Sequence, residues 1–74
     1  MSIEIEFIEK VGAKIKEKRI EAGHSQLDFA ILLNIEDSAL RRIESGKTNP
    51  TLKTLYRIAA ALNLTICDIL KVEE

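Results

Sequence analysis

Apolar residues recur every three or four positions along most of the chain, which is the spacing of amphipathic helices. Glycine, asparagine, serine and proline interrupt this pattern and favour turns. Five helices are predicted, at about residues 5–22, 25–33, 37–44, 51–62 and 65–70. Alternation typical of a strand is confined to Ile3, Ile5 and Phe7. The pattern therefore favours an all-α domain with short connections, preceded by an extended arm at residues 1–4.

The predicted boundaries coincide with residues that begin or end helices. Ser25, Thr51 and Thr65 each precede an apolar segment and have side chains that cap helix N-termini. Gly23 is placed to end the first helix. Asn34 tolerates left-handed backbone geometry and is placed to end the second.

Residues 26–45 show the pattern of two short helices that cross steeply. Ala30 is small enough to let the two backbones approach, and Asn34 accepts the positive φ angle of a tight turn. Apolar residues fall where the inner faces of both helices need them: Phe29, Leu33, Ile35, Leu40 and Ile43. The segment is therefore predicted to be a helix-turn-helix.

The third predicted helix has an outward face suited to DNA. If its apolar residues face the core, four others point outward: Asp37, Ser38, Arg41 and Arg42. In a major groove, Arg42 can donate to guanine O6 and N7, and Asp37 can accept from a cytosine amino group. Gln26, Lys47 and Thr48 are placed to hold phosphates, which fix register rather than sequence.

Charge is unevenly distributed along the 74 residues, although the net charge is only −1. Residues 10–72 contain all eleven basic residues but only seven acids, a balance of +4. The other acids lie at the two ends of the chain, so the middle of the sequence carries a net positive charge that suits a nucleic-acid partner.

The length fits one domain. No apolar run approaches the roughly 18 residues of a membrane helix, and a single cysteine suits a reducing cytoplasm.

Residues that would support catalysis or metal binding are sparse. No serine, cysteine or acidic pair has an evident base partner, and there is no glycine-rich phosphate loop. Cys67 and His24 supply too few ligands for zinc. The sequence therefore predicts a non-enzyme without metal or cofactor. Cys67 is expected in the core, and His24 and Tyr56 are expected to have packing roles.

The stretch from Val11 to Leu70 resembles the Cro/C1-type (XRE) helix-turn-helix family of transcriptional regulators. The resemblance rests on V-G-A-K-I-K-E-K-R (11–19), S-Q-x-x-F-A (25–30), I-x-x-S-x-L-x-R-I-E-S-G-K (35–47), N-P-T-L-x-T-L (49–55) and A-x-A-L-N-L (59–64). It implies a five-helix lambda-repressor-like DNA-binding domain over residues 11–70, with the helix-turn-helix at 26–45. Residues 1–10 are then an N-terminal extension and the start of the first helix, and residues 71–74 are an acidic tail.

The resemblance also implies roles for individual residues. Positions that read bases, or flank those that do, match Glu36, Asp37, Ser38, Arg41 and Arg42. Positions that contact the DNA backbone match Gln26, Lys47, Thr48 and Asn49, and Gln26 also matches a position that contacts an outer base. Arg19 and Glu44 match a pair that forms a salt bridge between the first and third helices.

Some residues depart from the family pattern. Glu36 stands where serine or threonine usually caps the recognition helix, so Asp37 is expected to take the capping role. Glu36 and Asp37 would repel phosphates unless they pair with Arg41 or with a cytosine. Asn34 replaces the usual turn glycine at a small cost.

The second helix also departs from the family pattern, because it carries apolar residues where polar ones are usual: Leu27, Ile31 and Leu32. This patch either contacts a partner or lies beneath the N-terminal residues.

The hypothesis that follows is a sequence-specific regulator of the repressor or controller type, bound to double-stranded DNA at the nucleoid in the cytoplasm. A homodimer is expected, because two copies on half-sites about 34 Å apart add their contacts. The candidate dimer surfaces are N-terminal (Ile3, Ile5, Phe7, Ile8) and C-terminal (Ile66, Ile69, Leu70, Val72). The alternative is a protein-interaction module or antitoxin that uses the apolar patch of the second helix.

Overall fold

The computed structural model of the chain describes residues 2–73, which form five α-helices and no strand. They are α1 (Ile3–Glu21), α2 (Gln26–Leu33), α3 (Asp37–Glu44), α4 (Leu52–Ala61) and α5 (Ile66–Leu70). The predicted all-α fold class is confirmed. Met1, assigned to the extended arm, and Glu74, assigned to the acidic tail, lie outside the described residues.

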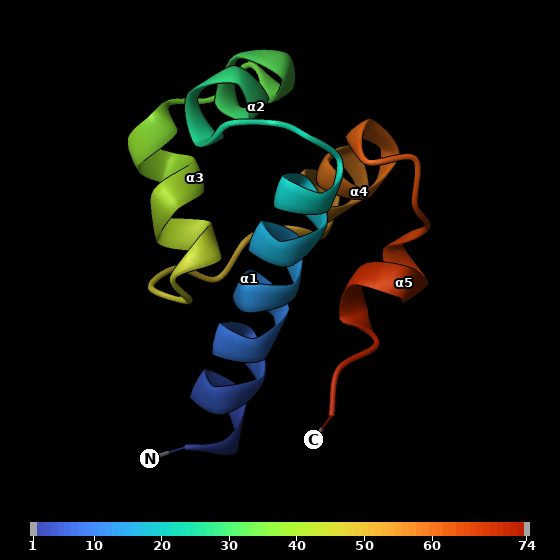
Figure 1. Cartoon of the computed structure of the whole chain (residues 1–74). Coiled ribbons are helices and arrows are strands. Elements are labelled where there is room, and N and C mark those ends of the chain that lie inside the picture. Colours follow the sequence, from blue (N-terminus) through green and yellow to red (C-terminus); the bar gives the residue numbers. More distant parts are fainter. Residues whose placement is uncertain (1, 74) are drawn as a thin grey trace.

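The longest helix, α1, runs through the molecule with the other helices arranged around it (Figure 1). It packs against α3 and α5, while α2 packs against α3 and α4, and α4 packs against α5. The start of α1 and the segment after α5 lie at the same end of the molecule. Two bonds join the middle of α1 to the segment after α5: Lys10 Nζ donates to the carbonyl oxygen of Glu73 (2.7 Å), and Lys14 Nζ to that of Lys71 (2.9 Å).

Side-chain caps define most helix starts. The hydroxyl of Ser25 accepts from the N–H of Asp28, and Thr51 caps α4 in the same way. At α5, Thr65 and Asp68 exchange two such bonds, of 2.9 and 3.1 Å. Each cap satisfies a backbone donor that the helix itself leaves free, which stabilises the helix by about 1 kcal/mol.

The start of α1 differs from the prediction. The helix begins at Ile3 rather than near residue 5, because the hydroxyl of Ser2 accepts from the N–H of Ile5 at 3.1 Å. Glu4 then lies in the first turn, where a negative charge is favoured. The described part of the predicted arm, residues 2–4, is therefore the N-cap and first residues of a helix.

One hydrophobic core joins all five helices. Its buried members are Val11 and Ile15 from α1, Phe29, Ala30 and Leu33 from α2, Leu40 and Ile43 from α3, Leu55, Ile58 and Ala59 from α4, and Ile69 from α5. The ring of half-buried His24 lies 5.3 Å from that of Phe29, measured between centroids, which supports the expected packing role of this histidine. The core thus fixes α2 and α3 against the rest of the molecule.

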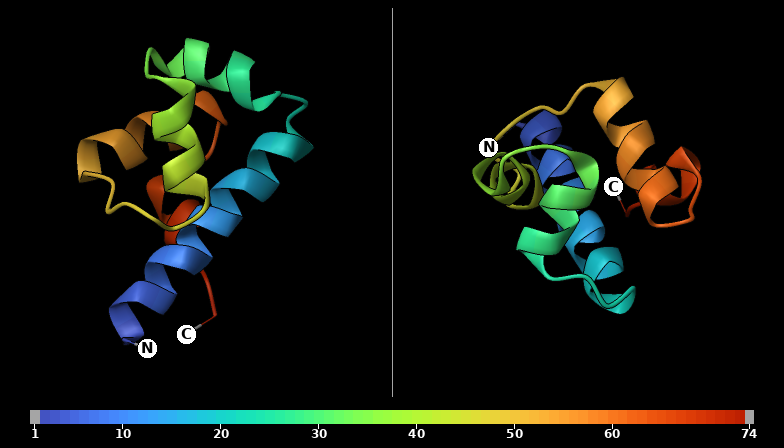
Figure 2. Two further views of the ribbon diagram at one scale, coloured as in Figure 1. Left: turned by 90° about the vertical axis from the view of Figure 1, so that its left-hand side faces the viewer. Right: turned by 90° about the horizontal axis from the view of Figure 1, so that it is seen from above.

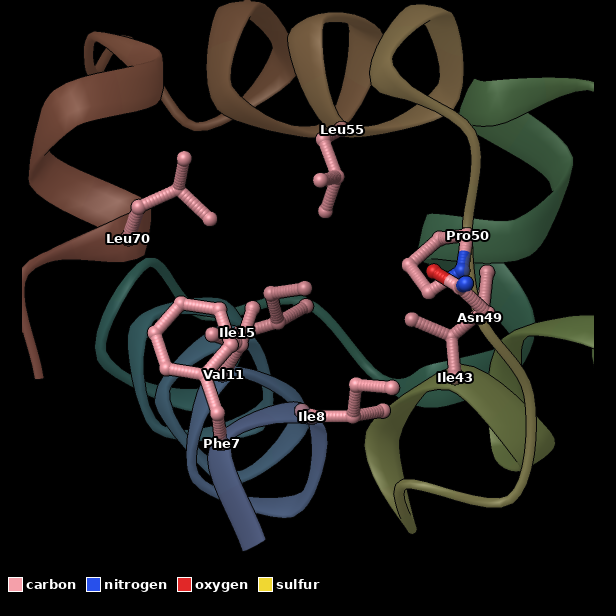
Figure 3. A pocket seen from close by; sticks show the side chains of 10 residues that line it. Phe7, Ile8, Val11, Ile15, Ile43, Asn49, Pro50, Leu55 and Leu70 are labelled. Carbon is pink, nitrogen blue, oxygen red and sulfur yellow. The ribbon is translucent and has the colours of Figure 1, made fainter. Parts of the chain in front are cut away.

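A small, mainly apolar cavity of about 60 Å³ remains between α1, α3, α4, α5 and the loop before α4 (Figure 3). Side chains from all sides point into it, among them Phe7, Val11, Leu55 and Leu70. Packing is therefore incomplete at this point of an otherwise dense interior.

Three expectations about burial are wrong. Tyr56, which was expected to have a packing role, is 66% exposed, as is its neighbour on α4, Leu52, at 70%, because Leu55, Ile58 and Ala59 form the buried side of this helix. Cys67 is exposed on α5 rather than in the core. Ile69, placed on a dimer surface, is fully buried within the protomer.

Within residues 2–73, no helix is both long and apolar enough to span a bilayer. The same residues contain no group of three or more potential metal ligands.

Candidate nucleic-acid interface

α3 buries one side and exposes the other. Leu40 is fully buried and Ile43 is 6% exposed, whereas Ser38, Arg41 and Arg42 are exposed. Turned to face the viewer, α3 lies across the front of the molecule, with α2 at its N-terminal end (Figure 2, left). The face from Ser38 to Arg42 therefore projects from the globule, as the sequence predicts.

The turn between α2 and α3 sets the direction of α3. Asn34 has φ 58° and ψ 46°, which is the left-handed geometry expected at this position. The N–H of Ile35 donates to the carbonyl of Ala30 at 3.0 Å, which closes the turn. Ala30 is 1% exposed, so a larger side chain would separate the two helices.

Arg57 of α4 supports this turn from outside. Its Nη2 donates to the carbonyl oxygen of Leu33, at the C-terminal end of α2. Positive charge is favoured at that end of a helix, where the last carbonyls lack partners within the helix. The sequence gives no signal for this contact, because a carbonyl-binding arginine and a solvated one look alike in a sequence.

α1 and α3 come into close contact at Gly12, whose role sequence reasoning missed. A Cβ atom at this position would clash with the carbonyl oxygen of Ile43 and would lie 2.9 Å from that of Glu44. Glycine is therefore the residue that lets the C-terminal half of α3 lie against α1. The available signal was an isolated glycine inside a helical pattern, which often marks close packing.

A buried ion pair joins α1 to the end of α3. Arg19 Nε lies 2.7 Å from Glu44 Oε2, and both side chains are less than 10% exposed. Arg19 also donates through Nη2 to Glu44 Oε1 (3.1 Å) and through Nη1 to the carbonyl oxygen of His24 (2.8 Å). Gln26 Nε2 donates to Glu44 Oε1 at 3.2 Å, so a candidate DNA-contacting side chain belongs to this cluster.

At the start of α3 the predicted capping role of Asp37 is wrong, whereas its expected pairing with Arg41 is present. Glu36 occupies the N-cap position but makes no side-chain capping bond there. Asp37 is the first helical residue rather than the cap, and its Oδ2 accepts from Arg41 Nη2 at 3.3 Å. Because both partners are exposed, this i,i+4 pair contributes only about 0.3–0.5 kcal/mol. Its effect is to neutralise one acid near the candidate interface.

The loop after α3 brings further predicted residues beside Arg42. Arg42, Thr48 and Asn49 line one open depression on the surface. The exposed Lys47 follows directly, and its N–H donates to the carbonyl of Arg42 at 2.9 Å. Gly46 makes this tight turn with φ +74°, and a Cβ there would clash with the backbone of Glu9.

The candidate residues thus form three groups. Arg42 lies with Thr48, Asn49 and Lys47, and Gln26 lies with the Arg19–Glu44 pair. Asp37 pairs with Arg41, next to the exposed Ser38. Within residues 2–73, no carboxylate forms a salt bridge with Arg42 or Lys47, so both cations are available to an anionic partner.

The apolar residues of α2 lie in the open. Leu27, Ile31 and Leu32 are 58%, 67% and 57% exposed. The N-terminal residues do not cover them, because they form the first turns of α1 at the opposite end of the molecule (Figure 1). Of the two options for this patch, burial beneath the N-terminus is therefore wrong.

Comparison with known proteins places the chain among helix-turn-helix proteins. Residues 15–69 match the family HTH_3, described as helix-turn-helix. The chain is 42% identical over 65 residues to the "ImmF control region 10 kDa protein" of Bacillus phage phi105, covering 88% of this chain and 71% of that protein. It is 34% identical over 62 residues to the HTH-type transcriptional regulator DdrOP3 of Deinococcus deserti, covering 84% of this chain and 48% of that protein.

A solved structure gives the same result in three dimensions. The fold superposes on an HTH_3 family transcriptional regulator from Vibrio cholerae with a TM-score of 0.80 and 28% identity. The match covers 88% of this chain but 36% of the Vibrio chain. The chain therefore corresponds to about half of DdrOP3 and about a third of the Vibrio regulator.

Proposed function

Because the chain belongs to the helix-turn-helix family of DNA-binding transcriptional regulators, we propose that it represses or controls transcription by binding specific double-stranded DNA as a homodimer. The observation that carries this proposal is the exposed Ser38–Arg42 face of α3, which the buried Leu40 and Ile43 hold outward. The family is one of DNA-binding regulators rather than of enzymes, and we propose no catalytic activity.

In this proposal α3 enters the major groove and its exposed side chains contact base edges. Arg42 donates to guanine O6 and N7, which discriminates by about 1–3 kcal/mol against other bases. Ser38 lies one helical turn before Arg42 and contacts a neighbouring base. Asp37 either keeps its bond to Arg41 or exchanges it for a cytosine amino group.

Phosphate contacts come from the two ends of the helix-turn-helix. Lys47, Thr48 and Asn49 follow α3, beside Arg42 in the surface depression. Gln26 begins α2, where the helix N-terminus also favours an anion. Contacts of this kind fix the protein on the duplex, and bases then determine the sequence preference.

A dimer would give a DNA-binding domain of this size enough base contacts to recognise a specific sequence. One recognition helix reads only a few base pairs, and two copies on half-sites about 34 Å apart add their contacts. The protomer measures 32 Å along its longest axis, which suits two copies side by side on one helical turn of DNA. Ile3 and Ile5 are 77% and 50% exposed and are the most accessible of the candidate dimer residues. We place the dimer at the nucleoid in the cytoplasm.

Selection of bound duplexes from a random pool tests the proposal. We expect one enriched site with two related half-sites. Affinity for that site should fall steeply with salt, with a log–log slope of about −0.9 for each phosphate contacted. A pool that yields no enriched site, together with binding that does not change with salt, would refute DNA binding.

The second candidate function is docking of a protein partner on α2. The exposure of Leu27, Ile31 and Leu32 favours it, because a group of large apolar side chains exposed to water is typical of a surface that binds another protein. Substitution of Ile31 by Lys separates the two functions. A DNA-binding protein that makes no use of the apolar patch on α2 keeps its DNA affinity in this variant, whereas a docking module loses its partner.

A further inference from the structure

The contact between Gln26 and Glu44 connects the two ends of the helix-turn-helix. Gln26 is the first residue of α2 and Glu44 is the last residue of α3. Gln26 Nε2 donates to Glu44 Oε1 at 3.2 Å. This bond therefore joins a half-buried side chain at the candidate interface to the carboxylate of Glu44, whose side chain is 3% exposed.

Glu44 is itself held in place by Arg19. Its two oxygens accept from Arg19 Nε (2.7 Å) and Nη2 (3.1 Å), and Arg19 is fixed in turn by the carbonyl of His24. Within residues 2–73, no buried side-chain nitrogen or oxygen lacks a hydrogen-bond partner. The carboxylate thus has little freedom to move, and it offers Gln26 an acceptor at a fixed point.

We propose that Glu44 is a positioning residue for DNA binding, which holds the Gln26 carboxamide in its binding geometry before DNA arrives. A glutamine carboxamide has two N–H donors and one carbonyl oxygen. Glu44 takes up one donor and leaves the other, with the oxygen, for a phosphate or a base edge. This inference rests on the proposed function, because it assigns the purpose of the contact to DNA binding.

The advantage lies in side-chain ordering. A free glutamine loses rotamer freedom when it is fixed at an interface, and a side chain fixed beforehand avoids that loss. The expected gain in DNA affinity is about two- to tenfold. The Arg19–Glu44 pair then has two effects: it joins α1 to α3, and through Glu44 it restricts the motion of the Gln26 side chain at the proposed DNA-binding surface.

The first test needs no DNA. Gln26 is the only glutamine in the chain, so in a ¹³C,¹⁵N-labelled sample of the full protein its side-chain amide signals are assigned once the side-chain carbon shifts separate them from those of the asparagines. We expect the Gln26 carboxamide to be as ordered as the backbone, while those of the exposed Asn49 and Asn63 are mobile. A Gln26 carboxamide as mobile as those two would overturn the inference, whatever the DNA affinity.

The second test is a double-mutant cycle on DNA affinity with Glu44→Asp and Gln26→Ala. Glu44→Asp keeps the charge that Arg19 requires and withdraws the carboxylate from Gln26 by one methylene. We expect it to weaken binding to the selected site about two- to tenfold when Gln26 is present, and to have no effect in the Gln26→Ala background. Equal losses in both backgrounds would show a general structural effect and overturn the positioning role.

The two proposals fail in different ways. If the wild-type chain binds no DNA, the proposed function falls. If it binds DNA but the Gln26 carboxamide is mobile or the cycle is additive, the positioning role alone falls. Folding of each variant is checked beforehand by circular dichroism and thermal melting, and the wild-type amide measurement decides the matter even if Glu44→Asp does not fold.

Discussion

At the scale of single residues, two glycines depend on the close approach of a backbone segment that is distant in the sequence. Gly12 and Gly46 both lie where another part of the backbone leaves no room for a Cβ atom. They place the C-terminal half of α3 and the following loop against α1. The sequence shows these glycines but does not show what lies opposite them, since those atoms come from a distant part of the chain.

Replacement of Gly12 by Ala tests this close contact. Alanine is the better helix former by about 1 kcal/mol, so an unobstructed site would give a more stable protein. We expect the opposite, a loss of about 1–3 kcal/mol in the free energy of unfolding, because the added methyl group forces α1 and α3 apart. Urea unfolding measures the change, with exposed Ala13→Ser as the control on the same helix. A stabilised Gly12→Ala variant would contradict the close contact.

Burial of individual residues was the least predictable property. The apolar face of α4 is broad, and its exposed edge, at Leu52 and Tyr56, cannot be distinguished by spacing from the edge that packs on the core. Cys67 lies beside the half-buried Ile66 on a one-turn helix, too short for periodicity to show which side is buried. Contacts such as that between Gln26 and Glu44 depend on side-chain placement and are not present in any local pattern.

At the scale of helices, the sequence predicted most of the architecture. Ser25, Thr51 and Thr65 mark helix starts because a short hydroxyl side chain competes well for free amide groups, and each makes that bond. Asn34 marks the turn because its side chain tolerates left-handed geometry. The start of α1 lies two residues before its predicted position, because the Ser2 side chain caps the helix.

The capping box of α5 predicts a dependence of stability on pH. The backbone N–H of Thr65 and then its hydroxyl lower the pKa of Asp68 from its ordinary value of 3.8, because both favour the ionised carboxylate. A lowered pKa in the folded state means that this stabilisation is complete above pH 3.8 and is lost as the pH falls through the folded-state value.

Comparison with Asp68→Asn isolates this effect from the other acids. We expect the wild type to be more stable than the variant near neutral pH, and the difference to shrink as the pH falls below 3.8. Urea unfolding of both proteins across this range provides the measurement. A difference that stays constant down to the lowest pH would mean that the carboxylate does not stabilise α5.

At the scale of the whole molecule, a domain of this size buries a modest fraction of its surface and has little stability to spare. The cavity lined by Phe7, Val11 and Leu55 leaves part of the interior unfilled (Figure 3). Each buried methylene group added without strain stabilises a protein by about 0.8 kcal/mol. The cavity is therefore a place where a substitution on α1 can increase stability without changing any of the candidate DNA-contacting side chains.

Substitution of Val11 by Ile tests this point by adding one methylene group at the cavity wall. We expect the free energy of unfolding to rise by about 0.5–1 kcal/mol. The matched control is Val72→Ile at a half-buried position after α5, for which a change below about 0.5 kcal/mol is expected. A destabilised Val11→Ile variant would show that the cavity cannot accept the added group.

We propose that Arg42, on the outward face of α3, distinguishes one DNA sequence from another. The most direct measurement compares the affinities of wild type and Arg42→Ala for the selected duplex and for random DNA, with Lys16→Ala on α1 as a control that removes the same charge. We expect Arg42→Ala to lose about 1–3 kcal/mol more binding free energy on the selected duplex than on random DNA, and Lys16→Ala to lose the same small amount on both. Equal losses on the two duplexes for Arg42→Ala would contradict it.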